Sequence, residues 1–340
     1  MVSGQSGGRP ERGRGQPPHA RDRPARALEG AALAPVSEGE GSSAPPPQGG
    51  LAFGVLRLLR PWQWSKNSLC LAGVFFSGKV FEPSAVAQAL GTAAVFSATS
   101  SGVYALNDAL DRERDREHPT KRSRPVASGV VAPGLAYGLA LVLALAGLAG
   151  GYALSKAVAL CLALYLLNNA LYSFRLKHVA LLDVLSIALG FVLRLVAGVV
   201  AVGVVPTAWI VTCTLFLALF LALGKRYGEL RRTLAQDGAR PALEGYTQAG
   251  LEQLLTSAAT AAILAYAVFT TSSGKNPTLI VTLPVVVYGV YAYQQLVMSG
   301  EPGSEAPDLL LFRRWRFPAC VVVWLALYYA VDYAGLTLFR

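Results

Sequence analysis

The sequence predicts an all-α, polytopic membrane protein, and its composition is the first evidence. Hydrophobic residues make up 53% of the 340 residues, whereas charged residues make up only 15%. From Trp62 onward, nine apolar stretches approach the length of about 20 residues that a helix needs to cross a bilayer. Only helices or closed barrels satisfy every backbone polar group in lipid. We therefore expect nine transmembrane helices.

The first 50 residues differ from the rest of the chain. They contain no Phe, Trp or Tyr and are rich in Pro, Gly, Ser and Arg. A segment of this composition cannot bury enough apolar area to offset the entropy lost on ordering. We expect a disordered N-terminal tail over residues 1–50 and a transmembrane domain over residues 51–340. The tail lacks the continuous apolar core of a secretory signal, and no nucleic-acid partner is expected.

The predicted spans can be placed in order along the chain. They lie near residues 62–82, 84–107, 130–150, 152–173, 180–204, 207–226, 250–272, 277–297 and 315–337. Residues 53–66, FGVLRLLRPWQWSK, have an amphipathic pattern that predicts a helix in the cytoplasmic interface of the membrane. Trp62 and Trp64 would lie at headgroup depth.

The loops predict an orientation, because Lys and Arg accumulate on the cytoplasmic side of membrane proteins. The loops after the second, fourth, sixth and eighth spans contain DRERDREHPTKRSRP, FRLKH, GKRYGELRR and FRRWR. The intervening loops carry only Lys79, Lys156 and Lys275. With nine spans, all four basic loops fall on one side. We expect a plasma-membrane protein with its N terminus and active site cytoplasmic and its C terminus outside.

Acidic residues gather at the end of the second predicted span. Asp108, Asp111 and Asp115 share one stripe if the helix continues through them, and three such carboxylates repel one another unless a cation lies among them. A solvated charged loop is the alternative reading. However, Asn107 and Asp108 lie near membrane depth, where unpaired acids are costly and usually functional. Carboxylates in small number suit Mg²⁺, which bridges them to substrate phosphates.

Basic residues follow the acids directly. Lys121, Arg122 and Arg124 can contact phosphate oxygens, and Arg offers a bidentate fork for them. The acids and bases together predict a magnesium-dependent site for a phosphorylated substrate.

The sequence NDALDRERD, with HPTKRSRPVASG after it and RPWQWSKN before it, resembles the UbiA superfamily of intramembrane prenyltransferases. The resemblance covers nearly all of residues 55–340. It implies a bundle of nine transmembrane helices around a cytoplasm-facing cavity, in which acids bind Mg²⁺ on a diphosphate. By position, it assigns the catalytic and metal-binding roles to Asp108, Asp111 and Asp115.

One segment departs from the commonest pattern of this superfamily. Members that prenylate aromatic acceptors carry a second acidic motif, D-x-x-x-D, in the loop after the sixth helix. At that place this chain has GKRYGEL, with Lys225, Arg226 and Glu229. One acid and two bases suit an additional phosphate better than a second metal-bound diphosphate.

Three further segments resemble the decaprenyl-phosphate phosphoribosyltransferase branch of the superfamily. They are LKHVALLDVLSIALGFVLRLVAGVVAVGV, LFLALFLALGKRYGEL and GYTQAGLEQLL. This resemblance implies transfer of 5-phosphoribose from phosphoribosyl pyrophosphate to a polyprenyl phosphate. The product would serve the synthesis of cell-wall arabinan precursors.

Other charged residues are candidates for substrate binding, each with an alternative. Lys66 can instead extend toward lipid headgroups, and topology alone would place Arg175 and Lys177 at a helix end. Asp183 and Arg194 are about three helical turns apart and share a face of the fifth span. They either mark a cavity or form a buried structural pair.

The complete set of predicted substrate-binding residues comes from all of these segments. It is Lys66, Asn107, Lys121, Arg122, Arg124, Arg175, Lys177, Asp183, Arg194, Lys225, Arg226 and Glu229. Two other functions stay open: a prenyltransferase for an aromatic or quinone precursor, which the bases at 225 and 226 disfavour, and a membrane transporter. A transporter would lead us to expect internal repeats with broken helices, and we find no convincing repeat. The sequence predicts neither the lipid chain length nor the oligomeric state.

Overall fold

Every long regular element in the described part of the chain is a helix. A computed structural model describes residues 50–118, 120–234, 245–272, 276–301 and 314–339. All of these ranges belong to one compact unit, Pro47–Arg340. Except for Gly50, the predicted disordered tail lies outside the described residues.

The N-terminal part of the unit consists of three short helices. They are α1 (Leu51–Leu59), a 3₁₀ helix, η1 (Pro61–Leu71), and α2 (Ala72–Phe76). The prediction of one helix over residues 53–66 is wrong, because α1 ends where Arg60 adopts a positive φ of 51°. Pro61 follows, and proline lacks the amide proton that a continuing helix would use. The predicted first span is therefore divided between η1 and α2.

Longer helices follow in the order that the apolar stretches predict. They are α3 (Pro83–Leu110), α5 (Pro133–Leu154), α6 (Lys156–Phe174), α7 (Leu182–Ala201), α8 (Ala208–Leu234), α10 (Gln248–Ser272), α11 (Leu283–Ser299) and α13 (Arg316–Asp332). Shorter helices lie between them: α4 (Arg112–Glu117) and the 3₁₀ helices η2 (Lys121–Ser123), η3 (Leu176–His178) and η4 (Pro277–Thr282).

Seven helical segments within the described residues are long and apolar enough to cross a membrane. The predicted class, an all-helical multi-pass membrane protein, is therefore confirmed. The count of nine spans is not reached by this criterion. The two other predicted spans are the divided first one and α13, which has 17 residues.

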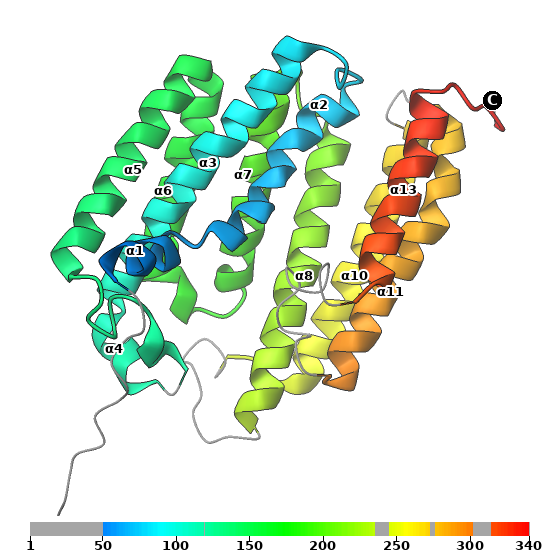
Figure 1. Ribbon diagram of the computed structural model, residues 1–340. Helices are drawn as coiled ribbons and strands as arrows, with labels where there is room; N and C mark the ends of the chain where they lie inside the picture. Colours follow the sequence, from blue (N-terminus) through cyan, green and yellow to red (C-terminus); the bar gives the residue numbers. More distant parts are fainter. Residues whose placement is uncertain (1–49, 119, 235–244, 273–275, 302–313, 340) are drawn as a thin grey trace, which may run out of the picture. The chain divides into compact units, whose positions relative to one another are not determined.

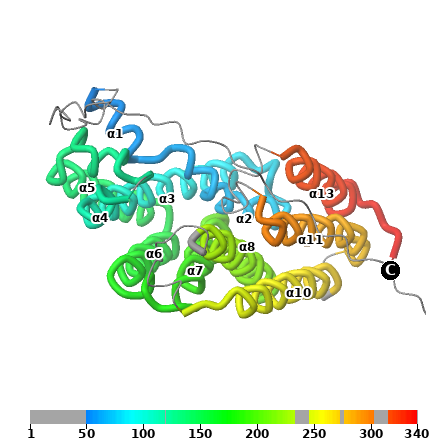
Figure 2. The backbone as a smooth tube through the Cα atoms, turned by 90° about the horizontal axis from the view of Figure 1, so that it is seen from below, coloured from blue at the N-terminus to red at the C-terminus, as the bar shows by residue number. Residues whose placement is uncertain are grey.

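The helices pack mainly against their neighbours in the chain. α3 contacts α5, α6 contacts α7, and α8 contacts both α7 and α10 (Figure 1). Viewed from below, α8 lies between α7 and α10 (Figure 2). The largest cluster of buried apolar side chains joins α7, α8, α10 and α11.

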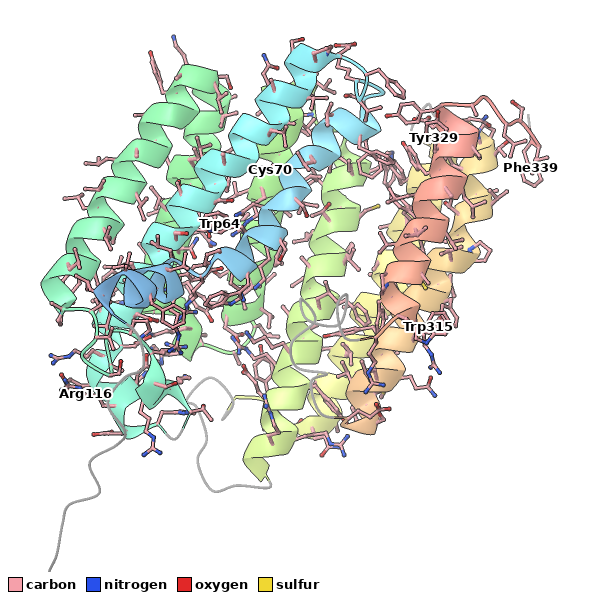
Figure 3. The ribbon with its side chains drawn as sticks, in the orientation of Figure 1. Trp64, Cys70, Arg116, Trp315, Tyr329 and Phe339 are labelled. Atoms are coloured by element: carbon pink, nitrogen blue, oxygen red, sulfur yellow. The ribbon has the colours of Figure 1, made fainter. Side chains whose placement is uncertain are left out.

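The packing of the N-terminal helices on α7 depends on glycine. A Cβ atom on Gly198 would lie 2.0 Å from the carbonyl oxygen of Cys70, and one on Gly73 would lie 2.2 Å from the carbonyl oxygen of Gly198. Such backbone approach through small residues is typical of helices that pack within membranes. On the other side of η1, Trp64 donates a 3.0 Å hydrogen bond to Ser101 of α3 (Figure 3). η1 is thereby fixed between α3 and α7.

Candidate functional site

The acidic motif lies where α3 ends and α4 begins. The amides of Asp111 and Asp115 donate to the carbonyl oxygens of Asn107 and Asp111, at 2.9 and 2.8 Å, so helical hydrogen bonding continues across the boundary. The carboxylates of Asp108 and Asp115 are 1% and 2% exposed, whereas Asp111 is 31% exposed. The predicted stripe of acids therefore contains two buried carboxylates and one that solvent reaches.

Two arginines neutralise the buried acids. Arg60 Nη2 donates to Asp108 Oδ1 at 2.6 Å, and Arg124 Nη1 donates to Asp115 Oδ2 at 2.7 Å. The same Arg124 nitrogen lies 3.4 Å from Asp108 Oδ1, so this arginine links both carboxylates. Asp108 Oδ2 is buried and has no hydrogen-bond partner among the described residues. A carboxylate oxygen left in this state is available to a cation or a donor group.

The third acid contacts the segment that follows α6. Lys177 Nζ lies 3.0 Å from Asp111 Oδ1, and Ser173 Oγ donates to Asn107 Oδ1 at 2.6 Å. The structure thus brings two predicted substrate-binding residues, Asn107 and Lys177, to the acids. We call the six charged residues at this place the acid cluster: Asp108, Asp111, Asp115, Arg60, Arg124 and Lys177. In Figure 3, Arg116 marks α4 at the same end of α3.

A second polar cluster forms around Asp183 in the first turn of α7. Asp183 and Arg226 are both buried, and Arg226 Nε donates to Asp183 Oδ2 at 2.5 Å. The other guanidinium nitrogens of Arg226 donate to Glu229 Oε2 at 2.5 Å and to the hydroxyl of Tyr172 at 3.2 Å. The hydroxyl of Tyr246 donates to Asp183 Oδ1 at 2.8 Å, and burial raises the pKa of this tyrosine. We call these five residues the Asp183 cluster.

The basic segment of the Asp183 cluster is helical. The prediction that GKRYGEL forms a loop is wrong, because α8 continues to Leu234. No proline interrupts residues 208–234, and the ion pair between Arg226 and Glu229 has the spacing that stabilises a helix. Lys225 is exposed whereas its neighbour Arg226 is buried, so the two predicted phosphate ligands have different surroundings.

The acid cluster and the Asp183 cluster meet at the C-terminal end of α6. Tyr172 accepts a hydrogen bond from Arg226, and the next residue, Ser173, donates one to Asn107. Consecutive residues of α6 therefore contact Arg226 of the Asp183 cluster and Asn107, which directly precedes Asp108 of the acid cluster.

Arg194 lies deeper in α7 and does not pair with Asp183. Its Nε donates to Asn67 Oδ1 at 2.7 Å, its Nη1 to the carbonyl of Gly190 at 2.7 Å, and its Nη2 to the hydroxyl of Tyr165 at 2.9 Å. Its guanidinium also lies over the ring of Tyr165, 4.6 Å from the centroid. Among the described residues, no carboxylate comes within ion-pair distance of it. Its role in substrate binding stays a prediction.

Four other predicted substrate-binding residues stay at the level of prediction. Lys66 and Lys121 are partly buried, and Arg122 and Arg175 are exposed. Lys66 immediately precedes Asn67, which anchors η1 to Arg194. Lys121 and Arg122 lie in η2, between the acids of α4 and Arg124.

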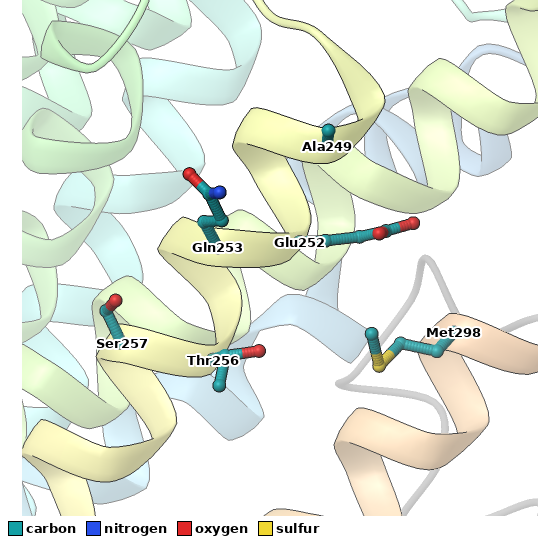
Figure 4. Close-up of a pocket in the computed structure, with 6 residues that line it drawn as sticks. All are labelled: Ala249, Glu252, Gln253, Thr256, Ser257 and Met298. Atoms are coloured by element: carbon teal, nitrogen blue, oxygen red, sulfur yellow. The ribbon is translucent and has the colours of Figure 1, made fainter.

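A pocket of about 480 Å³ opens elsewhere, between α10 and α11 (Figure 4). Its lining residues are Ala249, Glu252, Gln253, Thr256, Ser257 and Met298. None of these is a predicted site residue. Glu252 Oε1 accepts hydrogen bonds from Tyr227 at 2.8 Å and from Gln248 at 3.0 Å, so the protein itself occupies this oxygen.

The acid cluster fits Mg²⁺ by the chemistry of its donors. In the part of the chain that the structure describes, no three His, Cys, Asp or Glu side chains converge as a complete metal cage. Mg²⁺ does not need one, because it commonly binds one or two carboxylates together with waters and substrate phosphates. The unpartnered buried oxygen of Asp108 supplies one such ligand.

Four residues that belong to the two clusters or contact Asn107 beside the acid cluster were not among the predicted site residues. Arg60 begins RPWQWSKN, and Tyr246 lies in GYTQAGLEQLL. Both segments support the family resemblance, which is a signal that could have identified these two residues. Tyr172 and Ser173 precede FRLKH without a signal of their own. Their importance follows only from the contact of Ser173 with α3 and that of Tyr172 with α8.

Residues 68–317 match the profile of the UbiA prenyltransferase family. The chain is 35% identical over 274 residues to the decaprenyl-phosphate phosphoribosyltransferase of Corynebacterium glutamicum, which covers 77% of this chain and 81% of that protein. It is 39% identical over 246 residues to the protein of the same name from Mycolicibacterium smegmatis, which covers 71% of this chain and 77% of that protein.

A solved structure shows the same fold. It is a UbiA homologue from Archaeoglobus fulgidus bound to DMAPP and Mg²⁺, with a TM-score of 0.65 and 20% sequence identity. The match covers 83% of this chain and 100% of that chain. The relatives span most of the sequence, and so does the family profile, which includes the acid motif from Asn107 to Asp115; this chain therefore belongs to the UbiA prenyltransferase family.

Proposed function

We propose that this protein transfers 5-phosphoribose from phosphoribosyl pyrophosphate to a polyprenyl phosphate and releases pyrophosphate. Relatives named decaprenyl-phosphate phosphoribosyltransferase share 35% to 39% of their aligned residues with it. The observation that carries the proposal is the link through α6: Arg226 of α8 contacts Tyr172, and the next residue, Ser173, contacts Asn107 beside the acid motif. A donor with a pyrophosphate at one end and a phosphate at the other matches two adjacent charged sites.

The acid cluster is the proposed site for the pyrophosphate of the donor. Asp108, Asp111 and Asp115 would hold Mg²⁺, which supplies positive charge to the departing pyrophosphate. Arg60, Arg124 and Lys177 neutralise these carboxylates in the structure. They carry two guanidinium groups and one ammonium group as hydrogen-bond donors. Such groups form strong charge-assisted hydrogen bonds to phosphate oxygens. The protein can therefore contact the pyrophosphate directly as well as through the metal ligands.

The bond changes follow from this arrangement. The bond between C1 of the ribose and the pyrophosphate oxygen breaks, and a bond forms between C1 and an oxygen of the lipid phosphate. Attack on the face opposite to the leaving group inverts the configuration at C1. The acceptor needs no general base, because a phosphate monoester with a second pKa of about 6 is mostly dianionic at neutral pH.

The remaining bases position the substrates. Lys121 and Arg122 follow the acids in η2, and Lys225 is exposed beside the Asp183 cluster. In this proposal they hold the phosphate ends of the donor and the acceptor, which supplies orientation and not proton transfer. Arg226 supports this region through its bonds to Asp183 and Glu229.

The same proposal includes the orientation in the membrane. The two clusters lie at the basic loops, and basic loops of membrane proteins face the cytoplasm. We place the site at the cytoplasmic surface of the plasma membrane, where phosphoribosyl pyrophosphate is available. The N terminus is then cytoplasmic and the C terminus outside.

Labelled substrates test the function directly. Purified protein is incubated with phosphoribosyl pyrophosphate labelled in the ribose and with a polyprenyl phosphate, and the lipid is extracted. We expect label in the lipid fraction. In parallel, a prenyl diphosphate is offered with 4-hydroxybenzoate, and we expect no prenylated product. The opposite pattern would show an aromatic prenyltransferase and overturn the proposal.

A further inference from the structure

Tyr246 occupies an unusual place beside the proposed site. It precedes α10 by two residues, and its side chain is buried in the apolar cluster that includes Val184 and Leu251. Its hydroxyl donates to Asp183 Oδ1 at 2.8 Å and accepts from the backbone amide of Leu181 at 2.7 Å. One buried hydroxyl therefore satisfies a carboxylate oxygen and a backbone amide.

Leu181, whose backbone amide donates to Tyr246, has a strained backbone conformation. Leu181 precedes α7 with φ 68° and ψ −43°, a conformation that residues with a side chain rarely adopt. Such a conformation costs free energy and persists only where surrounding contacts enforce it. The hydrogen bond from Leu181 to Tyr246 is one of those contacts.

The strained turn is part of the segment that carries Lys177. This segment connects α6 with α7, and Lys177 contacts Asp111 of the acid cluster at 3.0 Å. Leu181 therefore stands four residues after Lys177 in one short connection between the two helices. Asp183, on the far side of the turn, is held by Tyr246 and Arg226 together.

We propose that Tyr246 is a positioning residue that clamps the turn between α6 and α7, so that Lys177 and Asp183 keep their places around the donor. The inference rests on the proposed function for its kinetic consequence, but the clamp itself is a structural property. The hydroxyl of Tyr246 bonds to Asp183 and to Leu181, not to the acids of the acid cluster, so it acts through Asp183 and the turn.

The test replaces the hydroxyl alone, in the variant Tyr246→Phe. Hydrogen exchange is measured on peptides that cover residues 176–185, in protein held in nanodiscs. Loss of two buried hydrogen bonds, one of them to a carboxylate, corresponds to roughly 30-fold or more in an equilibrium constant. We expect faster exchange in this segment and a rise of that order in KM for phosphoribosyl pyrophosphate, with a smaller change in kcat and in KM for the lipid.

Tyr333→Phe is the matched control. The hydroxyl of Tyr333 donates to the carbonyl of Phe75 at 2.6 Å, away from both clusters. This variant should leave exchange of residues 176–185 and both KM values unchanged. Unchanged exchange in Tyr246→Phe, or an equal response to both variants, would overturn the clamp. If wild-type protein transfers no phosphoribose, the proposed function fails, while the exchange result still decides the clamp.

A second variant separates the clamp from general destabilisation. Glycine adopts a positive φ without strain, so Leu181→Gly should make the turn less dependent on Tyr246. The effect of Tyr246→Phe on exchange should then be smaller in the Leu181→Gly background. If Tyr246→Phe does not accumulate but the double variant does, the clamp is supported. If neither accumulates, or if the effect is equal in both backgrounds, the proposal is wrong.

Discussion

The acid cluster and the surroundings of Arg194 are both buried polar regions among apolar helices, but their partners differ. The cations of the acid cluster, Arg60, Arg124 and Lys177, are 21% to 28% exposed and lie at helix ends. Arg194 is 6% exposed, and its acceptors are the neutral oxygens of interior residues. Ion pairs that solvent reaches can exchange one partner for a ligand, whereas interior bonds of this kind hold helices together.

The partners of Arg194 extend this difference. Asn67 accepts from Arg194 and donates to Ser97 at 3.0 Å and to Ser100 at 3.4 Å. The chain of contacts joins η1, α3 and α7. In the acid cluster, by contrast, Asp108 Oδ2 is left without a partner among the described residues. We infer that the acid cluster is arranged for a ligand, and that the main contribution of Arg194 is to the fold.

The largest expected effect belongs to Asp111→Asn. This change should lower kcat/KM by more than about 100-fold, since even outer-shell groups of metal sites contribute 10- to 100-fold. Stability should change by less than about 1 kcal/mol, because the pair of Asp111 with Lys177 is partly exposed. Phosphoribosyl transfer and thermal unfolding in detergent measure the two effects. Glu113→Gln, in the same charged run but 73% exposed, is the control and should keep full activity.

Arg194→Gln should show the reverse pattern. The change removes a buried donor from Asn67 and Tyr165, and an unsatisfied buried polar group costs about 1–3 kcal/mol. We expect a lower unfolding temperature without a comparable loss of activity per folded molecule. The exposed Arg57 of α1 provides the control variant, Arg57→Gln, which should unfold like the wild type. A raised KM for either substrate at normal stability would contradict this inference and would show that Arg194 contributes to substrate binding.

Lys225→Ala should have the smallest effect. Lys225 is exposed, so loss of a phosphate contact there should raise KM for phosphoribosyl pyrophosphate by roughly 2- to 10-fold. Lys156→Ala, at the opposite end of α6 from the acid cluster, controls for the general loss of a positive charge. An unchanged KM for phosphoribosyl pyrophosphate in Lys225→Ala would show that Lys225 does not contact the donor.

Much of the helical architecture could be predicted, because the length of an apolar stretch is a local property of the sequence. α3, α6 and α7 lie close to the predicted ranges 84–107, 152–173 and 180–204. The prediction was wrong where charged residues were interpreted as the end of a transmembrane helix. The segment GKRYGEL is charged and still helical, since Arg226 finds its partners on α7 and within α8.

The residues of the candidate site were predicted better than their contacts. The pairs Arg60 with Asp108, Lys177 with Asp111, and Tyr246 with Asp183 join residues 48, 66 and 63 positions apart. Such pairs depend on how helices pack, and no local pattern encodes them. The face shared by Asp183 and Arg194 is an example: the spacing was correct, but the two residues bind different partners.

Binding of labelled phosphoribosyl pyrophosphate to purified protein tests most directly whether the acid cluster is the donor site. Equilibrium binding is measured with Mg²⁺ and with a chelator, for wild-type protein and for Asp111→Asn. We expect saturable binding that requires Mg²⁺ in the wild type and is lost in the variant. Equally strong binding in the presence of the chelator and in Asp111→Asn would contradict the assignment of the donor pyrophosphate to the acid cluster.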